Sequence, residues 1–246
     1  MEESSSIIDG GKMIKQNLLI ENIPAILWGE NSTKIMVAVH GNMSSKTDVP
    51  IAMLAEEAIP LGYQVLSFDL PQHGDRKEEI TLCKVQNCVQ DLYMIMDFAI
   101  RHSNHISLFA CSMGVYFSLL TYKDVPIRRS LFLSPIVDMS RIIDNMMTWF
   151  NVSEEKLQAE QEIQTPLGHA LYWDYYCYVK ENPVDYWNSP TAILYGKEDN
   201  FCEFDIVSSF ATRFACSLAV MEKGEHYFHT PDQLKFYREW LKENLQ

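Results

Sequence analysis

Residues 106–121 of the chain have the sequence ISLFACSMGVYFSLLT, and this segment is the most informative about the architecture. Its first part, Ile106–Cys111, has the apolar, β-rich composition of a strand buried on both faces. The run leads directly into Ser112-Met113-Gly114, and we expect a helix over Val115–Thr121. A strand, a tight turn with small residues around a serine, and a helix form a nucleophile elbow. This order of elements predicts that Ser112 is a nucleophile.

The residues on either side of the serine agree with that prediction. An elbow imposes strained backbone geometry on its serine, so the residues two before and two after it must be small. Ala110 and Gly114 meet the requirement, although the usual pattern has Gly at both places. Ala-x-Ser-x-Gly alone is a common string, and its position directly after a buried strand is what favours a nucleophile.

The rest of the chain alternates short β-rich runs with segments of helical periodicity. Strands are predicted at residues 17–20, 23–28, 34–39, 64–70, 106–111, 130–137, 191–195 and 217–221. Apolar residues from Leu82 to Ala99 recur at helical spacing. A final helix is expected to begin at Thr230-Pro231-Asp232-Gln233, which has the sequence of a capping box. Alternating strands and helices predict an α/β fold, with a mostly parallel sheet of about eight strands flanked by helices.

Residues 138–188 interrupt this alternation. We find no good strand there, and residues 153–162 have the pattern of a polar helix. The segment is rich in aromatic residues: Trp149, Phe150, Tyr172, Trp173, Tyr175, Tyr176, Tyr178, Tyr186 and Trp187. We interpret it as a helical lid inserted into a core formed by residues 1–137 and 189–246. Aromatic clusters often form a local core, but so many rings in a small lid predict that some, Trp149 and Trp173 among them, line a substrate pocket above Ser112.

Over roughly residues 17–245 the chain resembles the α/β hydrolases of the small esterase, lipase and serine aminopeptidase type. The resemblance implies a catalytic triad in the order nucleophile, acid, histidine. His226 lies between the last strand and the last helix, where a loop can bring its ring over Ser112 as general base. His229 is its rival, and the Gly-x-His placement, from Gly224, favours His226.

The resemblance also implies a position for the acid. Asp199 follows the strand at 191–195 in the superfamily's Gly-x-x-Asp pattern, starting at Gly196. A carboxylate there would orient the imidazole of the histidine and stabilise its charged form. Glu198 is adjacent to it, and Asp138 is a stronger alternative because some members of the superfamily take the acid from the strand that follows the nucleophile helix.

An oxyanion hole requires two backbone N–H groups directed at the developing negative charge. The N–H of Met113 follows the nucleophile directly. Similarity of His40-Gly41 to the superfamily's His-Gly turn points to the N–H of Asn42 as the second donor. His40-Gly41 is equally consistent with a plain turn at the end of a strand, with the histidine bracing the loop.

Composition excludes several classes of function. The net charge of −13 argues against nucleic acid, because phosphate binding relies on clustered Lys and Arg. No apolar run is long enough for stable membrane insertion, no signal peptide is visible, and the six cysteines lack a CxxC pair, so we expect free thiols in a reducing cytoplasm. We find no metal-ligand spacing and no Gly-rich phosphate loop, so no metal or other cofactor is implied.

These features favour a serine hydrolase that cleaves small, uncharged, partly apolar carboxylic esters through an acyl-enzyme. Its partner would be a small-molecule ester or acyl substrate, and the sequence leaves the oligomeric state open. One alternative is a proline-iminopeptidase-like serine peptidase, in which lid carboxylates bind the free amine of the substrate. The candidates for that role are Glu154, Glu155, Glu160 and Glu162. The other alternative is a non-catalytic binding protein on the same fold.

Overall fold

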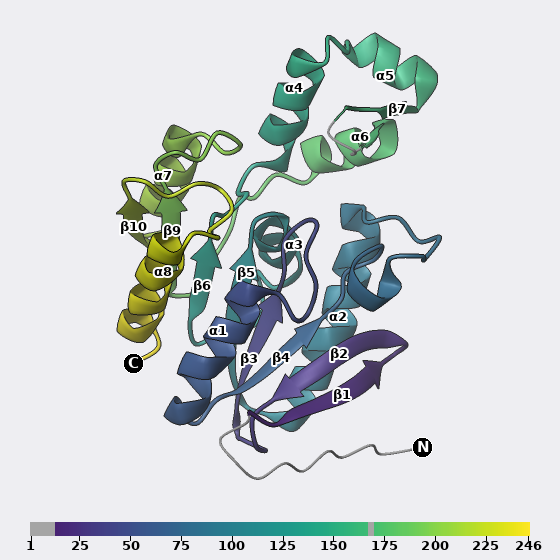
Figure 1. The fold of residues 1–246 in the computed structure, drawn as a ribbon. Helices are drawn as coiled ribbons and strands as arrows, with labels where there is room; N and C mark the ends of the chain where they lie inside the picture. Colours follow the sequence, from purple (N-terminus) through teal and green to yellow (C-terminus); the bar gives the residue numbers. More distant parts are fainter. Residues whose placement is uncertain (1–12, 167–169) are drawn as a thin grey trace.

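A computed structural model describes residues 13–166 and 170–246, and its centre is an eight-stranded sheet with the strand order β1-β2-β4-β3-β5-β6-β9-β10 (Figure 1). The strands are β1 (Lys15–Ile20), β2 (Ile23–Trp28), β3 (Lys34–Val39), β4 (Gln64–Phe68), β5 (His105–Cys111), β6 (Ser130–Leu133), β9 (Thr191–Gly196) and β10 (Ser217–Met221). β2 pairs antiparallel with β1 and β4, and every other neighbouring pair is parallel. The predicted mostly parallel sheet is confirmed.

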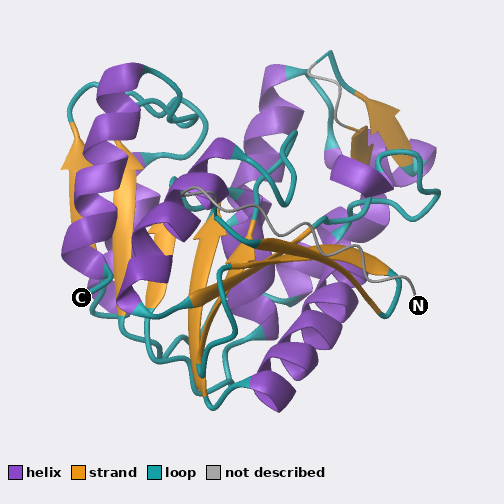
Figure 2. Cartoon of the chain, turned by 60° about the horizontal axis from the view of Figure 1, so that its bottom comes forward, coloured by secondary structure: helices purple, strands orange, loops and turns teal. Residues whose placement is uncertain are grey.

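Helices cover both faces of this sheet, as Figures 1 and 2 show. They are α1 (Val49–Ala58), α2 (Val85–His102), α3 (Met113–Thr121), α7 (Phe204–Arg213) and α8 (Pro231–Asn244). Successive side chains of a strand point to opposite faces, so each buried strand contributes to two cores. On β3, Met36 and Ala38 pack in the core that contains α1 and α8, whereas Val37 and Val39 pack in the core that contains α2, α3 and α7.

The start of α8 shows how local sequence fixes an element. The Thr230 side chain accepts a hydrogen bond from the N–H of Gln233, and the Gln233 side chain accepts one from the N–H of Thr230. This reciprocal capping box is the one that the sequence predicts. It also sets where the loop that carries His226 ends.

Two strands end earlier than the sequence predicts: β4 ends at Phe68, before the end of the strand predicted at 64–70, and β6 shows the larger difference. The sequence predicts a strand throughout residues 130–137, but β6 ends at Leu133. Ser134 has a φ of 45°, so the backbone turns out of the extended conformation there. The N–H of Ile136 then donates to the carbonyl oxygen of Ser112 (3.2 Å), which ties this turn to the turn after β5.

The inserted segment, residues 138–188, extends beyond the carboxyl ends of the strands (Figure 1). Its elements are α4 (Met139–Trp149), α5 (Glu154–Glu160), β7 (Glu162–Gln164), β8 (Ala170–Tyr172) and α6 (Trp173–Glu181). The expectation of no strand here is wrong, since β7 and β8 form a two-stranded antiparallel sheet. Strands of three residues are too short to show period-2 alternation, which explains why the pattern was missed.

The described residues contain no helix with both the length and the apolar character needed to cross a bilayer.

Candidate active site

The candidate site residues come from loops that follow the carboxyl ends of parallel strands. Ser112 follows β5, Asp199 follows β9, and His226 follows β10. The turn containing Gly41 and Asn42 follows β3, the neighbour of β5. Open α/β sheets bind ligands at this edge, because the carboxyl ends of all parallel strands meet there. The sheet order therefore brings together residues that lie far apart in the sequence, from Asn42 to His226.

Ser112 has the backbone strain expected of an elbow. Its φ is 51° and its ψ is −123°, a conformation that a residue with a side chain rarely adopts. The turn is crowded as well, since a Cβ atom on Gly114 would lie 2.4 Å from the carbonyl oxygen of His40. A Cβ atom on Gly41 would lie 3.0 Å from the Cβ of Ser112. The loop between β3 and α1, residues 40–48, is called the β3 loop below. Its first residue, His40, approaches Gly114 so closely that only a very small residue fits at position 114, as predicted.

The Ser112 hydroxyl meets a histidine ring. Its Oγ lies 2.8 Å from Nε2 of His226, within hydrogen-bond distance. On the other side of the ring, Nδ1 of His226 lies 2.7 Å from Oδ2 of Asp199. A carboxylate can only accept, so Nδ1 carries the proton and Nε2 is left to accept the serine proton. The structure therefore brings the three predicted triad residues into one hydrogen-bonded chain.

Asp199 is held in place by its own loop. Its Oδ1 accepts hydrogen bonds from the N–H groups of Phe201 (2.8 Å) and Cys202 (2.9 Å). Its side chain is fully buried. A buried carboxylate needs such partners, because an unpaired charge in the interior is costly. The two backbone bonds leave Oδ2 directed at His226.

The loops that carry Asp199 and His226 are in direct backbone contact. The N–H of Glu198 donates to the carbonyl oxygen of Gly224 (2.8 Å), and a Cβ atom on Gly196 would lie 2.4 Å from that same oxygen. Glycine is required at position 196 for this approach. The glycines of the Gly-x-x-Asp and Gly-x-His patterns, Gly196 and Gly224, thus contact each other and bring the two loops together.

Comparison with solved structures identifies the fold. Est1E from Butyrivibrio proteoclasticus, in its complex with ferulic acid, matches over 93% of this chain and 96% of its own, with a TM-score of 0.75 and 18% identity. An esterase from Pyrococcus furiosus matches with a TM-score of 0.69 and 16% identity, over 98% of this chain and 96% of its own. The proline iminopeptidase-related protein from Thermus thermophilus matches with a TM-score of 0.63 and 16% identity, over 95% of this chain and 97% of its own.

The chain has the α/β-hydrolase fold. At these identities the likeness establishes the fold alone. The sequence matches no protein-family model and no curated protein.

Within this α/β-hydrolase fold, the rival triad residues have other contacts. Nδ1 of His229 lies 2.8 Å from the carbonyl oxygen of Tyr227, and its ring stacks on the Tyr227 ring. Asp138 is the N-cap of α4, where its Oδ1 accepts the N–H of Arg141 (3.0 Å). Neither residue has the contacts of a triad member.

The loop predicted to form the oxyanion hole is held by contacts with Ser112 and with Asp69. Gly41 lies against Ser112, which puts the backbone of Asn42 next to the elbow, and Met113 is the first residue of α3. The first N–H groups of a helix have no acceptor within the helix, which suits Met113 to such a role. Further along the loop, the side chain of Lys46 forms a buried ion pair with Asp69, whose Oδ1 also accepts the Lys46 N–H (2.8 Å). Roles for Asn42 and Met113 as oxyanion donors stay a prediction.

His40 braces this loop as a neutral ring. Its Nδ1 donates to the carbonyl oxygen of Gly41 (2.6 Å), and its Nε2 accepts the N–H of Leu70 (3.0 Å). One nitrogen donates and the other accepts, which is the pattern of a neutral imidazole. Burial lowers the pKa of His40 to about 4, which agrees with these hydrogen bonds.

The two tryptophans predicted to line the pocket lie in different surroundings. Trp149 ends α4, is 49% exposed, and has its ring centroid 6.4 Å from that of Phe201. Phe201 in turn lies 5.2 Å from the ring of His226. Trp173 begins α6 and packs on Tyr176 within the inserted segment. Pocket roles for both tryptophans stay a prediction.

Phe201 is a site residue that the sequence analysis missed. Its position two residues after Asp199 is the only signal that could have indicated it.

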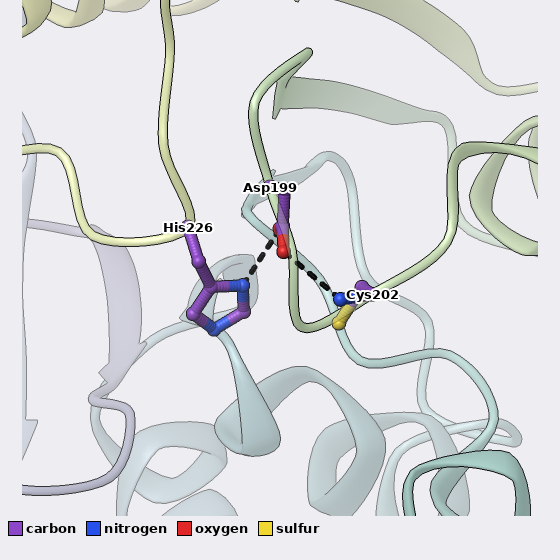
Figure 3. A group of neighbouring side chains, drawn as sticks. All are labelled: Asp199, Cys202 and His226. Atoms are coloured by element: carbon purple, nitrogen blue, oxygen red, sulfur yellow. Dashed lines mark hydrogen bonds and ion pairs between the residues drawn. The ribbon is translucent and has the colours of Figure 1, made fainter. Parts of the chain in front are cut away.

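Among the described residues, the only group of side chains close enough together to hold a metal ion is Asp199, Cys202 and His226 (Figure 3). Sequence spacing did not predict this grouping. Both Asp199 oxygens already accept hydrogen bonds, and burial raises the pKa of the Cys202 thiol, so that the thiol stays protonated. A cysteine binds a metal ion as the thiolate, and a carboxylate binds through an oxygen with a free lone pair. The contacts therefore favour a hydrogen-bonded triad over a metal centre.

A cavity of about 450 Å³ lies elsewhere, between the ends of the inserted segment and α7. Its lining includes Tyr116, Asp138, Lys180, Pro183 and Arg213, and none of the triad residues. The chemistry of the site does not depend on it.

Proposed function

We propose that this protein is a serine hydrolase that cleaves small, uncharged, partly apolar carboxylic esters through an acyl-enzyme intermediate. The observation that carries the proposal is the chain of hydrogen bonds from Ser112 Oγ to His226 Nε2 (2.8 Å) and from His226 Nδ1 to Asp199 Oδ2 (2.7 Å). A serine hydroxyl is a weak nucleophile unless an adjacent base takes its proton, and this geometry supplies one.

The proposed reaction has two halves. Ser112 Oγ attacks the ester carbonyl carbon while His226 Nε2 takes the hydroxyl proton, and Asp199 stabilises the resulting imidazolium. The oxyanion is bound by the N–H groups of Met113 and Asn42. His226 then donates its proton to the departing alkoxide, which leaves an acyl group on Ser112. Water, activated by His226, hydrolyses the acyl-enzyme and regenerates the serine.

The surroundings of the triad support an uncharged, partly apolar substrate. Phe201 lies over the imidazole of His226, and Trp149 lies against Phe201. Met43, next to Asn42 in the β3 loop, is 86% exposed. Aromatic and apolar walls favour acyl or aryl groups, at about 0.8 kcal/mol for each well-buried methylene. Residues 138–188 would act as the lid that closes this pocket.

A peptidase of the proline-iminopeptidase kind is a second candidate, and the likeness to the Thermus protein is a reason to test it. Such an enzyme needs unpaired carboxylates near the site to bind an amine. Glu154, at the start of α5, already interacts with the hydroxyl of Tyr176 (3.2 Å) and with Lys180 (3.9 Å). These contacts weigh against Glu154 as the residue that would bind the amine of such a substrate.

The test combines covalent labelling with a substrate panel. A fluorophosphonate should label the wild-type protein once, at Ser112, and the Ser112→Ala variant not at all. Ser209→Ala, which removes an exposed hydroxyl on α7, is the matched control and should label normally. p-Nitrophenyl acetate and butyrate should be hydrolysed faster than aminoacyl p-nitroanilides.

Each contrary result has a distinct meaning. Absence of labelling in folded protein would indicate a non-catalytic binding protein. Faster cleavage of the anilides would indicate a peptidase.

A further inference from the structure

Two cysteines outside the triad, Cys83 and Cys88, lie in contact with each other. Cys83 precedes α2, and Cys88 is buried in the first turns of that helix. Their Sγ atoms are 3.7 Å apart, close enough for a direct S–H···S contact. Cys83 is half-buried, so one side of the pair is accessible to a small solute. No step of the proposed hydrolysis uses either thiol.

The surroundings of Cys83 stabilise a thiolate. The hydrogen bond from Cys88 lowers the pKa of Cys83, and a hydrogen bond from His73 and the charge of Arg76 act in the same direction against burial. Burial and the neighbouring Cys83 sulfur raise the pKa of Cys88, so Cys88 keeps its proton and donates. The other groups that face the pair are Asp91 on α2 and Tyr175 on α6. Low-pKa, accessible thiols of this kind are the reactive ones.

His73 links this pair to the β3 loop. Its Nδ1 lies 2.8 Å from the carbonyl oxygen of Pro71, and its Nε2 lies 3.3 Å from Oδ1 of Asn42. Both partners are acceptors, so both hydrogen bonds form only when the ring is a doubly protonated imidazolium. Burial is the largest influence on the pKa of His73 and lowers it, but the hydrogen bond and charge of Cys83, the Pro71 carbonyl and the charge of Asp69 together raise the pKa. A charged His73 ring would in turn favour the thiolate form of Cys83, because its positive charge lowers the pKa of that thiol.

We propose that Cys83 and Cys88 form a peroxide-reactive dithiol, in which Cys83 is the attacking sulfur, Cys88 is the resolving thiol, and the product is a reversible disulfide next to the oxyanion loop. The site rests on two geometric features: the 3.7 Å separation of the sulfurs and the partial exposure of Cys83. The oxidant is a small hydroperoxide, with hydrogen peroxide as the simplest member of that class.

The chemistry balances in two steps. The Cys83 thiolate attacks one oxygen of hydrogen peroxide, an S–O bond forms, the O–O bond breaks, and the departing hydroxide takes a proton from His73 to become water. The Cys88 sulfur then attacks the sulfenic acid of Cys83, an S–S bond forms, and the second hydroxide leaves with the proton of Cys88 as water. The two thiols lose two electrons in total, and these reduce both peroxide oxygens.

Oxidation of the two cysteines should weaken the hydrogen bonding of the β3 loop. Once the thiolate is gone and His73 has given up a proton, the ring can donate only one hydrogen bond. Either Pro71 or Asn42 then loses its bond to His73, and the loop next to Ser112 loses one of its anchors. This second consequence rests on the proposed function, because it concerns the hydrolytic rate. The disulfide itself does not depend on the proposed function.

The first experiment measures the chemistry alone, on the full chain. One equivalent of hydrogen peroxide should give a Cys83–Cys88 disulfide by peptide mass mapping, and dithiothreitol should reverse it. At pH 6.5, iodoacetamide should modify Cys83 about tenfold faster than Cys177, a partly exposed thiol on α6. In the Cys88→Ser variant the sulfenic acid of Cys83 has no resolving thiol, so dimedone should trap it.

Cys177→Ser is the matched control, and its response to peroxide should equal that of the wild type. The proposal is overturned if peroxide oxidises Cys177 or Cys216 before Cys83, or if the disulfide does not form in the wild type. It is equally overturned if Cys83 and Cys177 are alkylated at the same rate.

The second experiment measures hydrolysis of p-nitrophenyl acetate before and after peroxide. The oxidised wild type should lose activity severalfold and recover with dithiothreitol, whereas Cys83→Ser, which lacks the thiolate from the start, should show the same activity before and after peroxide. Loss of the same size in Cys83→Ser would overturn the link to the β3 loop. If the reduced protein hydrolyses no ester, the proposed function fails, while the mass measurements still decide whether the dithiol site exists.

Discussion

The loops at the carboxyl edge of the sheet and the inserted segment both lie close to His226, but different forces hold them. The loops meet through backbone contacts at Gly114 and Gly196, where a single added Cβ atom would collide with a carbonyl oxygen. The inserted segment contacts the rest of the molecule through side chains, both in apolar packing, where Ile142 and Tyr176 share the core that contains α2 and α3, and in ion pairs such as the exposed Arg141–Glu203. Exposed pairs contribute about 0–1 kcal/mol each. Side-chain packing admits more residue types than backbone contacts at glycine do, so we expect the loops that carry Ser112, Asp199 and His226 to tolerate less change than the inserted segment, the proposed pocket wall.

The largest expected effect is in the loops at the carboxyl edge of the sheet. Ser112→Ala should reduce kcat/KM for p-nitrophenyl acetate on the order of 10⁴-fold or more, in line with triad knockouts generally, and leave the fold intact. Steady-state kinetics and circular dichroism on the same preparation measure both quantities. Turnover at the wild-type level, with contaminating esterase excluded, would remove Ser112 from the nucleophile role.

The second prediction compares one carboxylate from each region. Asp199→Asn should cost about 10³–10⁴-fold in kcat, because an amide no longer fixes the tautomer of His226. Asp138→Asn should cost only a few fold, since Asp138 caps α4 in the inserted segment and an asparagine caps a helix nearly as well. Ester kinetics on the two variants give the ranking, and the reverse ranking would move the acid to Asp138.

The third prediction concerns the pH dependence of stability in the loops at the carboxyl edge of the sheet. The pKa of buried His40 is about 4, below its value of about 6.5 in the unfolded chain, so the native state binds fewer protons between these two values. Neutral His40 therefore contributes stability that is fully present above pH 6.5 and is lost as the pH falls toward 4, by about 3 kcal/mol.

Urea unfolding at several pH values tests this. His40→Gln should be less stable than the wild type at pH 7 and should lose about 3 kcal/mol less between pH 7 and 4. His229→Gln, at an exposed ring, is the control and should follow the wild-type curve. Parallel curves for His40→Gln and the wild type would show that His40 is not held neutral in the native state.

The smallest expected effect lies in the pocket wall. Trp149→Ala should lower kcat/KM for an octanoate ester up to about tenfold more than for the acetate, because a longer chain loses apolar contact. The same kinetics on Trp173→Ala, whose ring packs on Tyr176, show whether that ring also affects chain-length preference. Kinetics across acetate, butyrate and octanoate distinguish the possibilities, since equal losses on all three esters would mean that a ring holds the segment together without touching the substrate.

The contrast between backbone contacts in the loops and side-chain contacts in the inserted segment also explains how much of the structure could be predicted from the sequence. The strand before Ser112, the Gly-x-x-Asp pattern and the Gly-x-His pattern are local signals for tight backbone turns, and such turns tolerate few residue types. Sheet topology then places these turns at one edge. The positions of Ser112, Asp199 and His226 could be predicted for that reason.

The inserted segment has no comparable signals. β7 and β8 are three residues long, and only the tertiary packing decides which aromatic ring faces which neighbour. Phe201 was missed because its role depends on the fold of its loop over His226, not on a pattern. The Cys83–Cys88 contact joins a loop to a helix through a spacing of five, which resembles no cysteine motif.

The cavity beside α7 has a consequence for how the molecule can diversify. The inserted segment begins at Asp138, and its last helix, α6, ends at Glu181, which marks the exit point of its helices; Val137 and Pro183, next to these two points, line this one cavity beside Tyr116. Tyr116 also donates its hydroxyl to the carbonyl oxygen of Asn182 (3.3 Å), so the exit point is fixed to α3. A replacement segment of different length could therefore be grafted between these two anchored points without altering the register of β6 and β9. Such an exchange would replace the proposed lid and leave Ser112, Asp199 and His226 in place.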